Sequence, residues 1–382
     1  MRAFARDGGQ MKIGIVADTH FGYSRFEEDA FMQAEAALRD AEQKADAIIL
    51  AGDVFDSKIP RLETIKRAAD IFSKIEKPIF VIHGNHERRS KGMTNAVQLL
   101  SSLGKMRYLH AQTEVIEIQG EKASITCMGS VPEDLASSGI RKVAESEINK
   151  IPKDAFKILV IHQSLSDIIR PNDEELCIDA LESLPFDLII NGHIHKYQSE
   201  LGGRLLIPGS TVITQLRSDE QGERGYILYN TKTRTHEFVK IPARQFFYME
   251  LRFDNAGMDE VKERIAKTVE DLQSKNENPV IKIRISGTLR EGLASGDLSF
   301  LHYDGVYLQN DINMESIREK IMKIRESREE KLSIREAALR QLGEKLRGKV
   351  RLFNPTELFE KLVESPDSAE QYLKKEKRES KA

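Results

Sequence analysis

The sequence predicts an α/β protein in which mixed β-sheets are flanked by helices, followed by a small α+β domain and a C-terminal helical segment. From Met11 onward, short apolar segments rich in β-branched residues alternate with amphipathic segments of helical period. The apolar segments are almost continuous, as in strands that helices cover on both faces. This alternation ends near Pro242, and from about Asn313 the chain is strongly charged and helical in pattern.

The elements of the first part follow one another in a regular order. One face of the first expected helix carries Phe31, Leu38 and Ala41. We expect helices at 27–45, 61–75 and 94–104. We expect strands at 12–18, 46–53, 77–86, 124–130, 156–163 and 185–193. Two further strands, 204–212 and 225–231, follow without a long helix between them, which indicates an antiparallel extension or a second sheet.

The later part of the chain predicts smaller units. A strand at 244–254, a helix at 259–275 and a strand at 279–289 form an α+β pattern. Near the C-terminus, Asn354 is a suitable helix cap and Pro355 suits the first helical turn. The expected segments are a disordered leader at 1–10, a main domain at 11–240, a small domain at 241–310, a charged helical linker at 311–349 and a helical segment at 350–382.

Composition narrows the class of protein. The 58 basic and 61 acidic residues nearly cancel, so a strongly basic surface for nucleic acid is absent and DNA binding would need local basic patches. Cys127 and Cys177 match neither a disulfide framework nor a zinc motif, which favours a reducing cytoplasm. The N-terminus has no apolar signal segment, and no run reaches the roughly 18 apolar residues of a membrane span.

Polar side chains that could bind a metal follow five of the expected strands. Five of the nine histidines fall at these positions. Because ligands bind at the carboxyl ends of strands in open α/β sheets, we expect these side chains to lie close together. They are, in chain order, Asp18 and His20, Asp53, Asn85 and His86, His162, and His193 and His195.

Each motif alone is a weak signal, because a strand-end aspartate often makes a turn and a lone histidine is often structural. Their combination is more specific. Asp, Asn and His without a thiolate suit manganese, iron or zinc. The number of donors exceeds the need of one ion and suits two ions, about 3.5–4 Å apart, that share a carboxylate.

The last motif, GHIH, contributes two histidines, His193 and His195, two residues apart. If the strand continues through this motif, residues i and i+2 share one face and lie about 6.5–7 Å apart. That spacing predicts that the two imidazoles reach two different ions. The alternative is a turn with two incidental histidines.

The five motifs, in the order D-x-H, G-D, G-N-H-E, H and G-H-x-H, resemble those of the calcineurin-like metallophosphoesterases and span residues 11–230. The stretches ADTHFGY, GDVFDSKIP, GNHERRS, IHQS, GHIHK and IPGST are similar to the nuclease subunit of the double-strand-break repair complex, in the family of SbcD and the meiotic-recombination nuclease. The resemblance implies a metallophosphoesterase-type mixed β-sheet sandwich at 11–240 and a capping or DNA-binding domain at 241–310.

The resemblance also implies a role for each matching residue. His86 would contact the phosphate and protonate the leaving oxygen, without binding a metal. Two Mn²⁺ ions are expected, with Mg²⁺ or another divalent ion as the alternative, and they would activate a water for attack on phosphorus. One ion would be held by Asp18, His20, Asp53 and His195. The other would be held by Asp53, Asn85, His162 and His193, so that Asp53 bridges the two.

One position departs from the family pattern. Many members have a histidine three residues after the G-D aspartate, and here that residue is Asp56. An ionised aspartate donates no hydrogen bond and repels phosphate, which puts exonuclease strength in doubt. The plainer interpretation is that Asp56 makes a turn. His83 lies beside the motifs but belongs to none, and we expect it to have a structural or supporting role.

Contacts to DNA are expected from basic residues near the second and third motifs. On a loop, such residues are often merely solvated. The family resemblance favours contact with phosphates, since sequence-independent DNA binding depends on lysine and arginine. The candidates are Lys58, Arg61, Arg88, Arg89 and Lys91.

The C-terminal segment carries one apolar stripe, formed by Leu358, Phe359, Leu362 and Val363. The stripe could pack on the chain itself, or a partner's groove could take it. The resemblance favours docking on the coiled coil of an SMC-like ATPase. It also implies a homodimer, for which the helices at 62–75 and 94–103 are candidates, although these could equally cover the sheet.

The leading hypothesis is therefore a manganese-dependent DNA endonuclease and exonuclease that works with an ATPase in double-strand-break repair, in the cytoplasm at DNA ends of the nucleoid. The alternative is a phosphatase or cyclic-nucleotide phosphodiesterase of the same superfamily, which the ligand set does not exclude. A non-catalytic scaffold is a third hypothesis, but it predicts lost ligands, and none is lost here.

Overall fold

The structure is a computed structural model. It describes residues 10–90, 92–104, 106–168, 176–289, 303–312, 354–365 and 368–373. Lys91, the leader up to residue 9 and the predicted linker from residue 313 lie outside the described residues. The chain divides into two compact units, one formed by residues up to 249 with 268–282 and 303–307, the other by 250–267, 283–302 and the residues from 308 onward.

The first sheet contains six strands in the order β12-β11-β1-β2-β3-β4. β1 to β4 run parallel, whereas β11 pairs antiparallel with β1 and β12 antiparallel with β11. β11 is therefore the antiparallel extension that the sequence indicated. The strands are β1 (Lys12–Val16), β2 (Ala47–Ala51), β3 (Ile79–Ile82), β4 (Arg107–Tyr108), β11 (Gly225–Asn230) and β12 (Thr235–Lys240).

The second sheet also contains six strands, in the order β5-β6-β7-β8-β10-β9. β6, β7, β8 and β10 run parallel, and the two outer strands are antiparallel to their neighbours. The strands are β5 (Gln112–Ile118), β6 (Glu121–Met128), β7 (Phe156–Ile161), β8 (Leu188–Asn191), β9 (Gln198–Glu200) and β10 (Leu205–Ile207).

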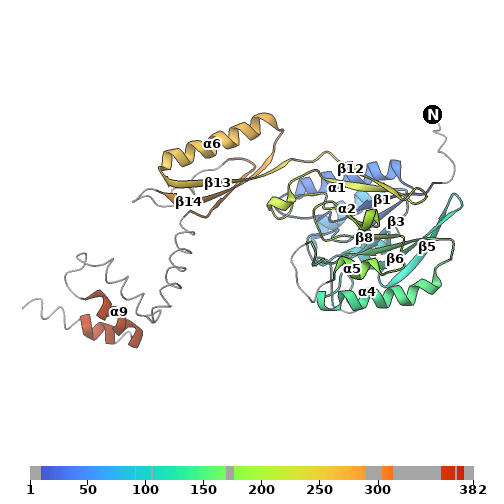
Figure 1. Cartoon of the computed structure of the whole chain (residues 1–382), viewed down its shortest axis with the longest axis horizontal. Helices are drawn as coiled ribbons and strands as arrows, with labels where there is room; N and C mark the ends of the chain where they lie inside the picture. The colour runs from blue at the N-terminus through green and yellow to red at the C-terminus, as the bar shows by residue number, and fades with distance from the viewer. Residues whose placement is uncertain are drawn as a thin grey trace, which may run out of the picture. The chain divides into compact units, whose positions relative to one another are not determined.

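The two sheets pack face to face, and helices cover their outer faces (Figure 1). Because side chains alternate across a strand, β2 serves two cores. Ile49 faces the layer between the sheets, whereas Ile48 and Leu50 pack with the helices on the outer face. Both faces of the central strands are buried, which explains their continuous apolar sequence. The prediction of mixed sheets flanked by helices is confirmed.

The helices lie in two groups. α1 to α3 pack on the first sheet and α4 and α5 on the second. Asn95 caps α3 through a reciprocal pair of hydrogen bonds with Gln98. The helices are α1 (Glu27–Lys44), α2 (Leu62–Ser73), α3 (Ala96–Ser102), α4 (Glu133–Glu147) and α5 (Ile178–Glu182), with 3₁₀ turns at Ile148–Lys150, Leu201–Gly203 and Ser218–Glu220.

The later residues form the α+β unit that the pattern indicated. α6 (Met258–Lys275) lies along β13 (Phe246–Ala256) and β14 (Val280–Leu289), and β15 (Val306–Asn310) completes a three-stranded sheet (Figure 1). Val261, Ile265 and Val269 recur every four residues on α6 and are buried, as an amphipathic helix requires.

The C-terminal helix α9 (Pro355–Glu364) begins after Asn354, as expected from the capping pattern. The Asn354 amide donates to the Tyr372 hydroxyl, so α9 contacts the short helical stretch that follows. The side chain of Val363 is outside the described part of the chain. Among the described helices, none combines the length and the apolar character that a bilayer crossing demands.

Candidate metal centre

The carboxyl ends of β1, β2 and β3 in one sheet and of β7 and β8 in the other meet at one place. There they bring together all seven residues that were expected to bind metal. The described residues form three groups of three, in each of which the ligand atoms lie within 4.8 Å of one another; two consist of expected metal ligands alone, and the remaining one is His20, Asp56 and His86. The first consists of Asp18, His20 and His195. The second consists of Asp53, His162 and His193.

Asn85 joins the second group, although it comes from the loop after β3. Its Oδ1 lies 2.8 Å from His193 Nδ1 and 3.2 Å from His162 Nε2. His162 Nε2 also lies 3.2 Å from Asp53 Oδ2. In the first group, the Nε2 atoms of His20 and His195 face each other at 3.3 Å. The structure thus divides the seven residues between two neighbouring groups.

These distances suit a divalent cation. Metal–ligand bonds of about 2.0–2.2 Å place neighbouring ligand atoms about 3 Å apart, which is the spacing within the second group. Two imidazole nitrogens that face each other at 3.3 Å in a buried position need a shared proton or a cation between them. The donors are oxygen and imidazole nitrogen alone, so the set fits manganese, iron or zinc.

The backbone at the site is strained in a way that points these side chains inward. Asp18, His20, Asp53 and His193 all have positive φ angles, of 52°, 44°, 46° and 74°. Non-glycine residues adopt this conformation at a cost, which is typical of functional sites. β8 ends at Asn191, so GHIH is a turn and the expected extended strand through it is wrong. The two histidines still reach different groups, because the turn directs them apart.

Glycines let the loops approach the ligands closely. A Cβ atom on Gly84 would lie 2.0 Å from Asp53 Oδ1, and one on Gly192 would lie 2.1 Å from the Ala51 carbonyl oxygen. That carbonyl accepts a hydrogen bond from His162 Nδ1 at 2.7 Å. The bond leaves Nε2 to face the second group. Burial alone would lower the pKa of His162, but the charge of Asp53 and the hydrogen bond with it raise the pKa to about 9, so a cation bound there would take the place of the Nε2 proton.

Electrostatics keep two members of the second group, Asp53 and His193, in the forms that bind metal. Burial alone would raise the pKa of Asp53, but the adjacent His162 and the other imidazoles hold it well below its usual range. Burial lowers the pKa of His193 to about 3, which leaves its imidazole neutral. Metal ligation requires an ionised carboxylate and a neutral imidazole.

Glu87 supports the site from behind. It is completely buried, and its two carboxyl oxygens accept hydrogen bonds from the amides of Phe55, at 2.5 Å, and Gly84, at 2.7 Å. Glu87 therefore joins the loop after β2 to the loop after β3. Burial, and then the charge of Asp53, raises the pKa of Glu87 to about 8. In the sequence, Glu87 is the last residue of the GNHE motif, and no role was predicted for it.

Glu220 supports His195, although the sequence did not predict this role. Its Oε1 lies 3.1 Å from His195 Nδ1 and accepts from the amide and hydroxyl of Thr214 at 3.1 and 2.9 Å. Burial alone would raise its pKa, but the hydrogen bond with His195 and its charge lower the pKa to about 2. A carboxylate behind an imidazole orients the ring toward a metal. No local pattern marks Glu220, because folding alone brings it to His195.

We expect Glu220→Gln to weaken metal binding by about 10- to 100-fold, the usual effect of losing such a supporting carboxylate. The measurement is a calorimetric titration with Mn²⁺. Asp219→Asn is the matched control, because Asp219 is the exposed neighbour of Glu220 and pairs with Arg217. Equal affinities for the two variants would mean that Glu220 does not orient His195.

His86 and Asp56 lie at the edge of the site. His86 Nδ1 donates to the Asp56 carbonyl oxygen at 2.8 Å, and its backbone amide donates to Asp53 Oδ1 at 2.9 Å. The carboxylate of Asp56 lies 3.3 Å from His20 Nδ1 and 3.6 Å from His86 Nδ1. Asp56 is thus more than a turn residue, since its side chain faces both histidines.

The basic candidates lie at different distances from the site. Arg88 lines the pocket beside the second group. Arg89 Nη1 donates to the Lys58 carbonyl oxygen at 3.2 Å, which holds those two loops together. Arg61 Nη2 donates to both carboxylate oxygens of Glu27, at 2.7 and 2.9 Å, and is partly neutralised by them.

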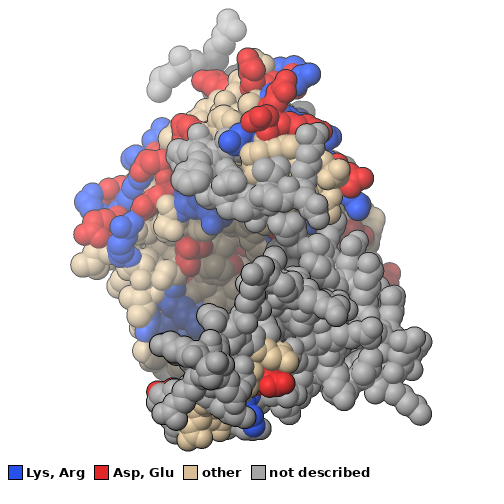
Figure 2. Space-filling model, turned by 90° about the vertical axis from the view of Figure 1, so that its left-hand side faces the viewer, with Lys and Arg blue, Asp and Glu red and all other residues tan. Residues whose placement is uncertain are grey.

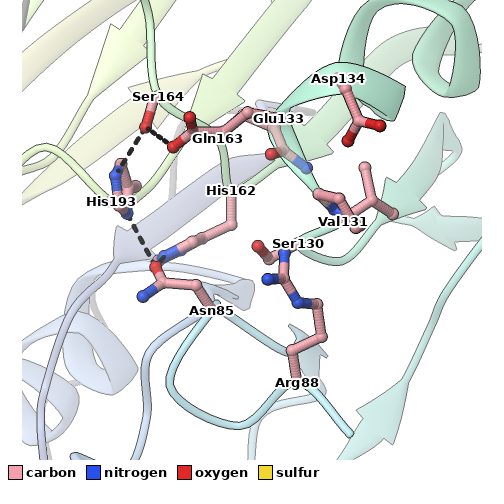
Figure 3. A pocket seen from close by; sticks show the side chains of 11 residues that line it. Asn85, Arg88, Ser130, Val131, Glu133, Asp134, His162, Gln163, Ser164 and His193 are labelled. Atoms are coloured by element: carbon pink, nitrogen blue, oxygen red, sulfur yellow. Dashed lines mark hydrogen bonds between the residues drawn. The ribbon is translucent and has the colours of Figure 1, made fainter. Parts of the chain in front are cut away.

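The pocket beside the second group has a volume of about 530 Å³. Asn85, His162 and His193 form one side of it, and Arg88 reaches toward Ser130 on the other (Figure 3). His83 does not line this pocket. Its Nε2 donates to the Ser130 carbonyl oxygen at 3.1 Å, which fits the supporting role expected for it.

Comparison with known proteins agrees with this geometry. Residues 11–197 match the family described as calcineurin-like phosphoesterase. The chain is 26% identical over 302 residues to the DNA double-strand break repair protein Mre11 of Methanosarcina mazei, covering 73% of this chain and 45% of the relative. It is 25% identical over 275 residues to Mre11 of Archaeoglobus fulgidus, covering 63% and 61%.

A eukaryotic relative is the double-strand break repair protein mre-11 of Caenorhabditis elegans, 25% identical over 297 residues, with 61% of this chain and 41% of the relative covered. The chain spans about half the length of the curated relatives it matches. The matched residues include all five strand-end motifs, and these are the motifs that resemble this family in the sequence. Residues 11–197 of the chain belong to the calcineurin-like phosphoesterase family.

Proposed function

We propose that this protein is a metal-dependent DNA nuclease that hydrolyses phosphodiester bonds in double-strand-break repair. The observation that carries the proposal is the pair of adjoining ligand groups, which approach each other where His162 Nε2 lies 4.0 Å from Asp18 Oδ1. Two adjoining cation sites suit phosphoryl transfer, in which both the attacking and the leaving oxygen need stabilisation. The similarity to proteins named for double-strand-break repair supports DNA as the substrate.

We propose that the centre holds two Mn²⁺ ions, one in each ligand group. When bound, divalent ions supply Lewis acidity for the attack of water on phosphorus. His86 is suited to donate the proton that the leaving oxygen needs. Its Nδ1–H is engaged by the Asp56 carbonyl, so Nε2 is the atom that exchanges a proton, and this atom lies 3.9 Å from Asp53 Oδ2.

The alternative is a phosphatase or cyclic-nucleotide phosphodiesterase, since the same ligands serve both. The relatives and the small α+β domain favour the nuclease, because a small-molecule phosphatase needs no such domain. The test is cleavage of supercoiled plasmid and of single-stranded DNA by the purified protein with Mn²⁺. Nicking that disappears with a chelator is expected. Hydrolysis of p-nitrophenyl phosphate esters without any DNA cleavage would reject the nuclease.

We propose that DNA contacts this chain through a few local arginines and lysines near the metal centre. Over the described part of one face, Lys and Arg side chains are interspersed with Asp and Glu, in keeping with the near-neutral net charge (Figure 2). Arg88 is the best placed candidate, because it lines the pocket beside the second ligand group. Lys58, Arg61, Arg89 and Lys91 remain weaker candidates for phosphate contact.

A homodimer is proposed on α2 and α3, which contact each other. Their surface exposes Leu62, Leu99 and Leu103, which are 77%, 45% and 62% accessible. Exposed leucines on adjoining helices favour burial against a second copy. We expect wild-type protein to be a dimer by light scattering and Leu99→Asp to be a monomer, because a charge is costly in an apolar interface.

The matched control for the dimer is Leu135→Asp, an equally exposed leucine on α4, which should leave the dimer unchanged. A wild-type monomer, or a Leu99→Asp dimer, would reject this surface.

The C-terminal helix α9 is proposed to dock on the coiled coil of an SMC-like ATPase. Phe359 and Leu362 are 43% and 52% exposed on it, and Leu358 is half-buried. An amphipathic helix with exposed apolar residues suits a groove in a partner. We expect Leu362→Asp to weaken ATPase binding at least about tenfold in a pull-down titration, by the cost of burying a charge.

Glu357→Gln on the same helix is the control and should bind like wild type. If Leu362→Asp retains full binding, α9 is not the docking element. With such a partner, we propose that the protein acts in the cytoplasm, at DNA ends of the nucleoid.

A further inference from the structure

A second cavity of about 370 Å³ adjoins the pocket at the metal centre. The two cavities share a wall, formed by Arg88, Ser130, Val131 and Pro132. The metal pocket lies on one side of this wall, with Asn85, His162 and His193. The second cavity is on the other side, and the functions proposed above leave it without a role.

Aromatic rings form much of the second cavity. His83 and Tyr108 are stacked, with their ring centroids 5.9 Å apart and 28° between the planes. His110 lies 4.9 Å from His83 and is exposed to solvent. The Gly129 amide donates to His110 Nδ1 at 3.1 Å and holds the ring in place. These contacts form a fixed ring platform with one accessible member.

Hydrogen bonds leave the rings of the platform neutral. His110 Nδ1 accepts from the Gly129 amide, and His83 Nδ1 lies 2.7 Å from the Tyr108 hydroxyl while its Nε2 donates to the Ser130 carbonyl oxygen. Neutral rings attract a flat π-system, whereas a phosphate prefers a cation. The ligand that fits the ring platform is therefore flat and uncharged.

Hydrogen-bonding groups stand beside the rings. The side-chain oxygens of Asn95 and Gln98 accept the two bonds of the helix cap, which leaves the Gln98 amide nitrogen as a donor toward this cavity. Arg88 and Arg89 supply guanidinium groups on the same lining. Flat, uncharged ligands with acceptor groups on their edges, such as nucleobases, match this combination of rings and donors.

We propose that this second cavity binds a nucleobase of the DNA strand next to the phosphate held at the metal centre. The proposal rests on the nuclease function proposed above. Arg88 lines both cavities, so a strand that passes it can place a phosphate on one side and the attached base on the other. A cavity of about 370 Å³ is within the usual range of small-ligand sites, which is about 300–1,000 Å³.

Base binding can be measured without turnover, with single-stranded oligonucleotides that carry one 2-aminopurine at successive positions. The protein is full-length His86→Ala loaded with Mn²⁺, which is expected to bind DNA and to cut it far more slowly than wild-type protein. Stacking quenches the fluorescence of 2-aminopurine. We expect quenching at one position beside the bond that wild-type protein cuts, and little at the others. Equal quenching at every position, or none, would overturn the base site.

Two substitutions at His110 separate stacking from hydrogen bonding. His110→Asn keeps an acceptor for the Gly129 amide but removes the ring, whereas His110→Phe keeps a ring and loses the acceptor. The base site predicts that His110→Phe retains the quenching and His110→Asn loses it. The reverse order would show that His110 only holds the loop and would overturn the proposal.

Cleavage of abasic DNA separates this inference from the nuclease proposal. Loss of one stacked base costs about 1–3 kcal/mol, so an abasic residue at the quenched position should slow wild-type cleavage by about 5- to 150-fold. Normal cleavage of that substrate would reject the base site and leave the nuclease standing. Failure to cut any DNA would reject both.

Discussion

Asp53→Asn is expected to abolish DNA cleavage, with a loss of at least about 10³-fold, and to remove the ion of the second group. Asp53 lies between the imidazoles of the site, 3.2 Å from His162 Nε2, and its charge is stabilised by them. Asparagine has nearly the same shape but no charge, so the change isolates the carboxylate. A bound metal contributes several kcal/mol to phosphoryl transfer, which corresponds to about this loss in rate.

The measurements are plasmid nicking in Mn²⁺ and the number of ions bound in equilibrium dialysis. Asp46→Asn is the matched control, because Asp46 is also buried but lies at the amino end of β2, where it accepts a hydrogen bond from the Lys12 amide at 2.9 Å. The control should keep both ions and full activity. An Asp53→Asn protein that binds two ions as tightly as wild type would show that the ligand groups are assigned wrongly.

His86→Ala should lower cleavage by about 10²- to 10⁴-fold, the usual contribution of a general acid, while both ions stay bound. His86 is 36% exposed and lies at the mouth of the site, with Nδ1 engaged by the Asp56 carbonyl. It belongs to neither of the two groups made of expected metal ligands alone, although it forms a third group with His20 and Asp56. In this variant, cleavage activity should therefore fall while the number of bound ions stays the same.

The same dialysis and nicking measurements apply to His86→Ala. His236→Ala is the control, since this histidine on β12 bonds to the Tyr197 hydroxyl and has no contact with the ligand groups. Loss of an ion in His86→Ala would mean that His86 is a ligand. DNA with a better leaving group at the scissile bond should restore part of the activity, because that bond then needs less protonation.

The elements that the sequence predicted well are those with a strong period. The central strands are buried on both faces and therefore almost purely apolar, and α1, α2 and α6 carry clear one-sided stripes. β5 and β12 lie at sheet edges, where the mixed exposure of alternate residues weakens the signal, and the sequence did not predict them. α4 was missed too, although its buried residues Ala136, Ile140, Val143, Ala144 and Glu147 recur at helical spacing.

The metal centre also contains features that the sequence predicted and features that it did not predict. Its seven candidate ligands could be named from the sequence because each follows an apolar strand, and the carboxyl ends of parallel strands must lie along one edge. The grouping of His193 and His195 could not be derived correctly, since GHIH is a turn with a positive φ at His193 rather than a strand. Backbone conformation in such a turn depends on contacts with Asp18, whose carboxylate accepts the His193 amide.

The sequence by itself determined the family, the main layers and the candidate ligands, because periodicity and strand-end motifs are local properties of the chain. The tertiary structure alone decided which residues support those ligands. Glu220 reaches His195 from 25 residues away, and Glu87 joins two loops that follow different strands. Contacts between distant segments leave no periodic trace in sequence, so the second cavity and its rings, His83, Tyr108 and His110, emerge only when the chain is folded.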